Sequence, residues 1–244
     1  RGHNVTLLER EDRLGGNLNT ASRIHHKGHM AQLISWYENQ LRQLGVTVKT
    51  QCCVEQEDLE SLQGDVLIFA TGSDPRGLPV PGADGPQVHY ARDILGHADR
   101  LGPHVAVIGG GQIGIETAIW LAREGKAVSV IEGTDTIMGG LRCSPSGDIS
   151  MAKRYIEYYG IDLRLNTLLQ SIQPDAITVQ EGEWVQTLPA DSVILSVGYR
   201  PRDSLFRQAQ AVLPEREMHL IGDAARVANV YGAIHEAHAL ASRI

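Results

Sequence analysis

Alternating strand and helix signals predict an α/β chain with mostly parallel sheets. The apolar runs at residues 65–70, 104–108 and 192–197 are typical of strands that are buried on both faces. Amphipathic segments separate such runs, and helices that alternate with strands are typical of parallel sheets covered on both faces. A length of 244 residues leaves room for two domains.

The predicted elements follow from apolar spacing and from the glycines and prolines between them. Residues 29–44 carry apolar side chains at helical spacing up to Gly45, which predicts a helix. Residues 74–82 contain three prolines and two glycines, so neither regular element is predicted there. The predicted strands are 5–9, 46–49, 65–70, 104–108, 128–131, 162–165, 192–197 and 218–221, with a hairpin of 176–180 and 184–187. Further helices are predicted at 113–124, 150–159 and from about residue 232.

A complete dinucleotide-binding motif follows the strand at residues 104–108. Gly109, Gly111 and Gly114 have the spacing of a phosphate loop that opens a helix. The first glycine makes a tight turn, the second lets the backbone approach a pyrophosphate, and the third permits close packing of helix and sheet. The sequence therefore predicts a nicotinamide dinucleotide site. The alternative is a tight strand–helix turn without a nucleotide. Two further residues of the loop and helix start are assigned to the nucleotide, Gln112 and Ile113.

Glu132 ends the next predicted strand, about twenty residues after the loop, where a ribose ligand is expected. A carboxylate accepts hydrogen bonds from the ribose hydroxyls but repels a 2′-phosphate, so the site is predicted to favour NADH over NADPH. Arg142 lies a few residues later and is an alternative partner for a 2′-phosphate, or a solvated loop side chain.

An acidic residue also ends the strand predicted at residues 5–9. Glu9 stands to this strand as Glu132 stands to the later one, so it is a candidate ligand for a second ribose; an exposed glutamate at a strand end is the alternative. A strand and a glycine loop normally precede such a residue, and the sequence shows neither before residue 5. The sequence therefore predicts that the chain begins inside a nucleotide site whose first strand lies upstream.

Three short motifs accompany Glu9. They are Arg13 with Gly15 and Gly16, the run 70–72 after a buried strand, and the run 221–224. Together they resemble the motifs with which flavoprotein reductases with two dinucleotide domains bind FAD. The resemblance implies that Glu9 binds the adenosine ribose, that Gly15 and Gly16 pass near the isoalloxazine, and that Asp223 binds the ribityl or pyrophosphate region. The remaining residues implied at the cofactors are Arg10, Asn17, Leu18, Val54, Ala70, Thr71, Gly72, Gly198 and Gly222.

The order of these stretches narrows the resemblance to one family. Residues 53–59, 69–76, 80–83 and 219–224 resemble the C-terminal reductase half of the bacterial 2,4-dienoyl-CoA reductase and trimethylamine dehydrogenase family, over nearly the whole chain. Within that family, Val54 is implied at the FAD adenine and Gly198 beside the nicotinamide or flavin. The loop at residues 24–28 departs from the pattern, because many relatives carry a proline there.

The resemblance implies two Rossmann-like domains, one for FAD and one for NAD(P). Residues 1–75 and 196–244 form a discontinuous FAD domain without its first strand, and residues 76–195 form the NAD(P) domain. Family members also carry an N-terminal barrel that binds FMN and a 4Fe–4S cluster, which are expected only in an N-terminal half of the same polypeptide outside this chain. Three cysteines do not supply the four ligands of such a cluster.

The predicted function is a reductase module that passes hydride from NAD(P)H to FAD and electrons onward to that half. No catalytic acid or base is assigned, because hydride transfer to a flavin depends on placement and the cofactors carry the chemistry. Two alternatives remain open: a non-catalytic scaffold that holds ADP or nothing, and a fragment without activity, with weak or absent FAD in the chain alone. The physiological substrate is not indicated.

Composition excludes several other classes. A net charge of −7 disfavours a nucleic-acid partner, since phosphate backbones require a clustered positive surface. No apolar run approaches the ~20 residues of a membrane span. Cys52, Cys53 and Cys143 have no two-residue spacing, so no zinc site or redox disulphide is predicted, and a cytoplasmic location is favoured. The loop histidines at 25, 26 and 29 lack companion ligands, so no metal is predicted; a homo-oligomer remains an alternative to a monomer.

Overall fold

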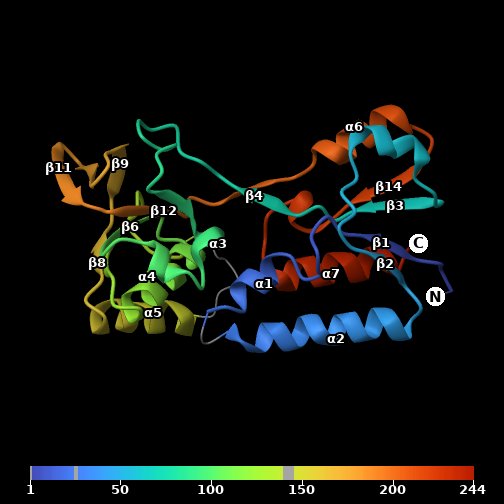
Figure 1. Cartoon of the computed structure of the whole chain (residues 1–244), viewed down its shortest axis with the longest axis horizontal. Helices are drawn as coiled ribbons and strands as arrows, with labels where there is room; N and C mark the ends of the chain where they lie inside the picture. The colour runs from blue at the N-terminus through green and yellow to red at the C-terminus, as the bar shows by residue number, and fades with distance from the viewer. Residues whose placement is uncertain (1, 25–26, 140–145) are drawn as a thin grey trace. The chain divides into compact units, whose positions relative to one another are not determined.

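The chain forms two compact units. The computed structural model describes residues 2–24, 27–139 and 146–244. Unit 1 comprises Arg1–Gly16, Leu33–Asp74 and Tyr199–Ile244, and unit 2 comprises Asn17–Gln32 and Pro75–Gly198. Each unit contains parallel strands together with helices, which confirms the α/β class (Figure 1). The assignment of residues 1–75, 76–195 and 196–244 to particular nucleotides stays a prediction.

Unit 2 is built on a five-stranded parallel sheet. The strand order is β5-β12-β6-β7-β8, so the chain returns after β8 to place β12 between β5 and β6. Every neighbouring pair in this order is parallel. The strands are β5 (Val88–Tyr90), β6 (His104–Ile108), β7 (Ala127–Ile131), β8 (Asp162–Arg164) and β12 (Ser192–Leu195).

The two faces of this sheet are covered differently. Val105 and Val107 of β6 pack toward the helices, whereas Ala106 and Ile108 pack toward a second sheet, as the alternation of a strand requires. The helices of the first face are α3 (Ala91–Ile94), α4 (Gln112–Arg123) and α5 (Ser146–Tyr158). The second face is covered by a three-stranded antiparallel sheet of β9 (Thr167–Ile172), β10 (Ala176–Glu181) and β11 (Trp184–Pro189). Both faces are therefore buried, as the apolar strands predict.

Unit 1 contains two separate pairs of parallel strands. β1 (Thr6–Leu8) pairs with β2 (Thr47–Lys49), and β3 (Val66–Phe69) pairs with β14 (Glu217–Leu220). Its buried core is small and centres on Leu59, Phe69 and Ala209. The helical segments are α2 (His29–Gln43), which enters the unit at Leu33, η2 (Gln56–Ser61), α6 (Ser204–Val212), η4 (Gly222–Ala224) and α7 (Val230–Ala241).

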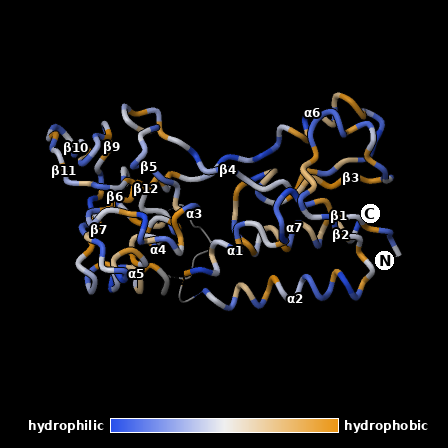
Figure 2. The backbone as a smooth tube through the Cα atoms, viewed as in Figure 1, coloured by the Kyte–Doolittle hydropathy of each residue, from blue (hydrophilic) through white to orange (hydrophobic). Residues whose placement is uncertain are grey.

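Hydropathy explains why these helices form as they do. Along α2, hydrophobic and hydrophilic residues alternate with the helical repeat (Figure 2), and the side chain of Ile34 is buried. α7 is apolar in sequence, yet no residue of this helix is buried. Within the part of the chain that is described, no helix combines the length and the apolar character that crossing a membrane requires.

Most predicted elements are confirmed, and the misses are short. The predicted helices at 29–44 and 113–124 correspond to α2 and α4, and the hairpin at 176–187 to β10 and β11. Sequence periodicity did not reveal β5, β9, α1 (Asn17–Ala21), α3, η3 (Ala98–Arg100) or α6. The prediction of no regular structure from residue 74 is wrong at its start, because β4 (Ser73–Pro75) pairs with β13 (Tyr199–Pro201). That pairing joins residues more than 120 positions apart, so no local sequence pattern predicts it.

A charged contact secures the amino ends of β6 and β12. Oδ2 of Asp191 accepts hydrogen bonds from the backbone N–H of His104 at 2.8 Å and from its Nδ1 at 2.9 Å. The backbone hydrogen bond from His104, followed by the ring hydrogen bond, holds the pKa of Asp191 below its ordinary value of 3.8. The ionised form of Asp191 therefore stabilises the folded state.

The variant Asp191→Asn is expected to melt at a lower temperature than the wild type at neutral pH. A carboxylate whose pKa is lowered by folding contributes stability above its unfolded pKa and loses that contribution as the pH falls through the folded pKa. The difference in melting temperature should therefore shrink at pH values below 3.8. A difference that stays constant across the titration would show that the charge of Asp191 contributes nothing.

Candidate functional site

A cavity opens at the carboxyl ends of β6, β7 and β12 in unit 2. Its volume is about 400 Å³. The carboxyl ends of parallel strands are where open α/β sheets bind ligands. Of the residues predicted at the nucleotide, Gly109, Gly111, Glu132 and Gly198 line this cavity. The other lining residues are Leu78, Ile108, Ile131, Gly133, Thr167, Leu168, Leu169, Ser196 and Val197.

The first and third glycines are required by close packing within unit 2. Gly109 has a φ of 106°, and a Cβ atom there would overlap the carbonyl oxygen of Ser196. A Cβ atom at Gly114 would overlap the carbonyl oxygen of Gly109 and would lie 3.3 Å from Oγ of Ser196. α4 therefore approaches β6 as closely as the backbone allows, which places its amino end at the cavity.

The second glycine is not required by the protein itself. Gly111 has a φ of −66°, and a Cβ atom there would meet no atom within 4 Å. The space beside it belongs to the cavity, where a side chain would occupy room that a bound group needs. A pyrophosphate beside the amino end of a helix fits this open stretch of backbone. Gln112 and Ile113 form the first turn of α4 directly after it.

Three donors from the chain hold the carboxylate of Glu132 at the cavity. Oε2 accepts a hydrogen bond from the backbone N–H of Gly110 at 2.5 Å. Oε1 accepts from the backbone N–H and from Oγ1 of Thr134, each at 2.8 Å. The acid at the end of β7 is thus fixed beside the glycine loop, where its remaining lone pairs suit the hydroxyls of a ribose. The donor set and the glycine loop together fit a dinucleotide.

A partly buried ion pair lies on the next turn of α4, and no local sequence pattern predicts it. Nζ of Lys27 is 2.5 Å from Oε2 of Glu116, and both side chains are 17% exposed. Oε1 of Glu116 accepts a hydrogen bond from Nε2 of Gln112 at 3.0 Å. Gln112, which is predicted at the nucleotide, is therefore oriented through Glu116. The two charged residues are 89 positions apart, so only the fold brings them together.

In unit 1, five of the residues predicted at FAD lie where β3 and β14 end. The backbone N–H of Ile221 donates to the carbonyl of Phe69 at 3.0 Å, which aligns the run 70–72 with Gly222 and Asp223. Oδ2 of Asp223 accepts from Oγ of Ser73 at 3.0 Å, and Oδ1 accepts from the backbone N–H of Ala228 at 3.0 Å. The carboxylate is therefore held rigidly at this edge. Ala70, Thr71 and Gly72 lie on the strand end beside it.

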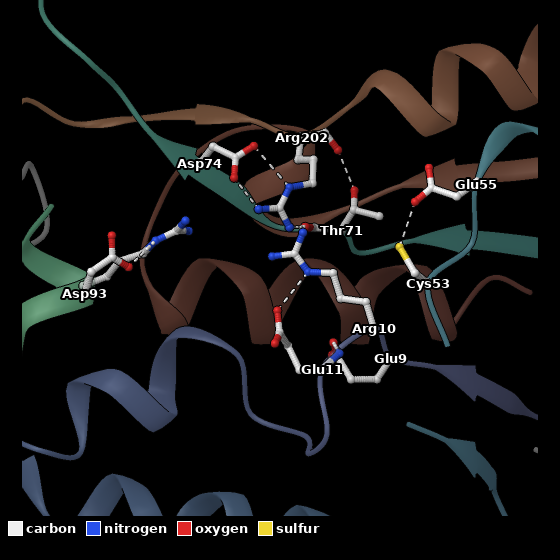
Figure 3. Close-up of polar contacts among 10 residues, drawn as sticks. Glu9, Arg10, Glu11, Cys53, Glu55, Thr71, Asp74, Asp93 and Arg202 are labelled. Atoms are coloured by element: carbon white, nitrogen blue, oxygen red, sulfur yellow. Dashed lines mark hydrogen bonds and ion pairs between the residues drawn. The ribbon is translucent and has the colours of Figure 1, made fainter. Parts of the chain in front are cut away.

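Arg202 fastens the chain at Thr71. Its guanidinium binds both carboxylate oxygens of Asp74 and donates to the carbonyl of Thr71 at 3.0 Å, while Oγ1 of Thr71 donates to the carbonyl of Arg202 at 2.5 Å (Figure 3). A bidentate arginine of this kind fixes both position and orientation. The turn that carries Thr71 and Gly72 is thereby set before any ligand binds.

Glu9 and Val54 belong to one hydrogen-bonded stretch of unit 1. Oε1 of Glu9 accepts from the backbone N–H of Glu11 at 2.9 Å, and the carbonyl of Glu9 accepts from the N–H of Cys52 at 2.9 Å. Val54 follows two residues later and packs against the core of Leu59 and Phe69. Arg10 is exposed and pairs with Glu11 at 3.0 Å (Figure 3).

The remaining predicted residues are placed as follows. Gly15 and Gly16 have φ values of 112° and 46° and close the loop after β1. Asn17 and Leu18 begin α1, and their contacts assign them to unit 2. Arg142, Cys143, His25 and His26 lie outside the described residues. Elsewhere in the described chain, no three His, Cys, Asp or Glu side chains converge as a metal site.

Cys53 is unsuited to thiolate chemistry. Its Sγ donates to Oε1 of Glu55 at 3.0 Å (Figure 3). This hydrogen bond, together with the nearby negative charge of Glu55, raises the pKa of the thiol. A thiol with a raised pKa is ionised less often at neutral pH and is therefore a weaker nucleophile.

A larger cavity of about 600 Å³ in unit 1 is chemically unsuited to a nucleotide. It lies at the amino ends of β3 and β14, beside Asp65 and Glu217. Two more carboxylates line it, those of Glu60 and Glu215, whereas Arg216 is its one cation. Four acidic groups repel phosphates. The smaller cavity in unit 2 is therefore the candidate site.

Most of the chain matches a known protein family. Residues 1–233 fit the family of pyridine nucleotide-disulphide oxidoreductases. The chain belongs to this family. Its cofactors are accordingly FAD and NAD(P)H. The glycine loop and the carboxylate of Glu132 are the features of unit 2 that accord with such a cofactor.

Several relatives of this oxidoreductase are larger proteins. A cinnamate reductase of Clostridium sporogenes is 33% identical over 246 residues, which is 100% of this chain and 36% of that protein. An NADH oxidase of Thermoanaerobacter brockii is 29% identical over 251 residues and is covered to 38%. The structure of a 2-naphthoyl-CoA reductase superposes with a TM-score of 0.91 at 28% identity, covering 100% of this chain and 36% of that one. The chain thus spans little more than a third of each, as expected for the reductase half of such enzymes.

A methyl group added at the third glycine of the oxidoreductase loop is expected to destabilise the fold, whereas one added at the second glycine is expected to weaken nucleotide binding. Gly114→Ala should lower the free energy of unfolding by roughly 3 kcal/mol, because the new Cβ overlaps the backbone of Gly109. Gly111→Ala should change it by less than about 0.5 kcal/mol yet weaken NADH binding about tenfold, because only the cavity loses space. Chemical denaturation and NADH titration of both variants give the comparison. Equal losses of stability would refute the distinction.

Proposed function

We propose that this chain is the reductase part of a larger flavin oxidoreductase, in which NADH delivers hydride to FAD. The electrons then pass to an FMN and 4Fe–4S half of the same polypeptide. The observation that carries this proposal is the cavity of unit 2, which joins a complete glycine loop to a fixed carboxylate. The names of the relatives support it, since they are reductases and an NADH oxidase.

FAD supplies the electron chemistry when bound, since it accepts two electrons and a proton as hydride and releases electrons to a further acceptor. The residues of the chain bind and orient. The loop after Ile108 and the amino end of α4 are placed to receive the pyrophosphate, and Glu132 to receive the adenosine ribose. In unit 1, Glu9 and Asp223 are the corresponding acceptors for FAD. No proton donor is assigned, because placement of the two cofactors suffices.

The proposed preference is for NADH over NADPH. The carboxylate of Glu132 accepts three hydrogen bonds from the chain, which hold it in place at the cavity. A fixed negative charge beside the ribose disfavours a 2′-phosphate. Asp135, three residues later, is exposed and adds a second negative charge to the same loop.

Two other functions are less well supported. A scaffold that holds ADP would use the same glycine loop and the same carboxylate, and it is disfavoured because the relatives are named as reductases and an NADH oxidase. A chain without activity is disfavoured by the preformed cavity of unit 2. We also propose a cytoplasmic location, because the chain has few cysteines and Cys52 and Cys53 are free.

Anaerobic mixing of the full-length, FAD-bound protein with NADH tests the function. The visible absorbance of oxidised flavin should disappear with NADH, and about tenfold more slowly with the same concentration of NADPH. Persistence of the oxidised spectrum with both nucleotides would refute hydride transfer. Faster reduction by NADPH would refute the preference alone.

Glu132→Gln is expected to lower the preference for NADH, expressed as the ratio of kcat/KM for NADH to kcat/KM for NADPH, about tenfold. Glutamine keeps the shape of the side chain and one acceptor oxygen but removes the negative charge that repels a 2′-phosphate. The ratio of kcat/KM for NADH to that for NADPH is the measurement. Glu183→Gln, an exposed change at the β10–β11 turn, is the matched control and should leave the ratio unaltered. An unchanged ratio in Glu132→Gln would place the source of discrimination elsewhere.

A further inference from the structure

A single arginine of unit 1, Arg202, is hydrogen-bonded to three of the four residues that follow Ala70. Its backbone N–H donates to the carbonyl of Gly72 at 3.0 Å. Its guanidinium donates to the carbonyl of Thr71 at 3.0 Å and binds both carboxylate oxygens of Asp74 (Figure 3). Its own carbonyl accepts from Oγ1 of Thr71 at 2.5 Å. One residue therefore determines the path of this turn.

Gly72 is the point of the turn that most needs such support. It has a φ of 76°, and a Cβ atom there would meet no atom within 4 Å. Because glycine has more backbone freedom than any other residue and nothing packs closely on this one, packing alone does not fix its conformation. The hydrogen bonds of Arg202 restrain the chain on both sides of Gly72, at Thr71 and at Asp74. The arginine thus does for this turn what packing does elsewhere.

The turn places Ser73 against a residue that is predicted at FAD. The side chain of Ser73 is 4% exposed, and its Oγ donates to Oδ2 of Asp223 at 3.0 Å. The other oxygen of this carboxylate, Oδ1, accepts from the backbone N–H of Ala228 at 3.0 Å. A carboxylate has about four acceptor sites, so two hydrogen bonds leave capacity for the hydroxyl groups of a ligand. Ser73 lies between Gly72 and Asp74, so a shift of either neighbour moves the hydroxyl that orients Asp223.

We propose that Arg202 is a positioning residue for FAD. By holding the backbone on both sides of Ser73, it fixes the carboxylate of Asp223 where the ribityl or pyrophosphate part of the cofactor binds. A guanidinium can bind a carboxylate through two N–H groups and still donate to a carbonyl, whereas the ammonium of a lysine is a point charge without this fork. The assignment rests on the proposed function, because that function includes the placement of Asp223 at FAD.

Arg202→Lys in the full-length protein tests the proposal. After removal of the bound flavin, titration of the apoprotein with FAD should give a Kd about tenfold higher than that of the wild type, because the carboxylate is no longer held in one place. At saturating FAD, the visible circular dichroism of the flavin should differ from that of the wild type. An arginine that only stabilised the fold would lower the melting temperature of the apoprotein and leave both flavin measurements, made well below that temperature, unaltered.

Asp74→Asn is a milder second variant, which also serves if Arg202→Lys does not fold. It removes the negative charge but leaves the guanidinium its hydrogen bond to the carbonyl of Thr71. The Kd of FAD should rise about threefold, as for the loss of a partly exposed ion pair. The double variant should raise the Kd by less than the product of the two single effects, because both substitutions break the same pair. Effects that multiply in full would contradict a shared network.

Arg207→Lys is the matched control. Arg207 of the same unit binds Oδ2 of Asp203 through two nitrogens, at 2.9 and 2.6 Å, but its side chain is 74% exposed. This variant should leave the Kd of FAD unchanged, and equal Kd values for Arg202→Lys and Arg207→Lys would overturn the proposal. If FAD binding depends on Arg202 while NADH leaves the bound flavin oxidised, the positioning role stands and the proposed function fails. If NADH reduces the flavin and Arg202→Lys binds FAD as the wild type does, the reverse holds.

Discussion

The close approach of α4 to β6 is the constraint on which unit 2 depends. With no side chain at Gly109 or Gly114, the first turn of the helix rests on the backbone of the strand end and of Ser196. This contact sets the direction of α4 and hence the position of its free N–H groups. It also ties β6 to β12, the neighbouring strand that ends at the same cavity. The glycines therefore create the site through packing before any of them touches a ligand.

The two units share one local hydrogen bond, formed by a carboxylate at the end of a strand. In unit 1 the carboxylate of Glu9 accepts from the N–H two residues later, and in unit 2 the carboxylate of Glu132 does the same at Thr134. Such a hydrogen bond turns the chain sharply and presents one edge of the carboxylate outward. The repeat seen in the sequence is thus a repeat of conformation. Each acid accepts a hydrogen bond from its own loop, and Glu132 accepts a further one from the backbone N–H of Gly110.

Features that rest on local spacing could be predicted from the sequence, whereas those created by distant pairing could not. The glycine loop, Glu132 and the strands that carry them combine apolar period, glycine spacing and a strand end within some thirty residues. Lys27 and Glu116 meet across 89 positions, and Leu168 reaches the cavity only because β9 is hydrogen-bonded to residues 132–134. An exposed leucine in a strand carries no local sign that it lines a cavity.

The two units also differ in how many apolar side chains they bury without a ligand. Unit 2 buries two apolar clusters, one on each face of its sheet, so its cavity is formed by a core that exists without ligand. Unit 1 buries chiefly Leu59, Phe69 and Ala209, its parallel strands stay in two separate pairs, and α7 buries no residue. A ligand that binds only folded unit 1 adds its binding free energy to a small folding free energy. A ligand that binds only the folded form of unit 1 would therefore account for a larger share of that unit's stability than a ligand of equal affinity would in unit 2.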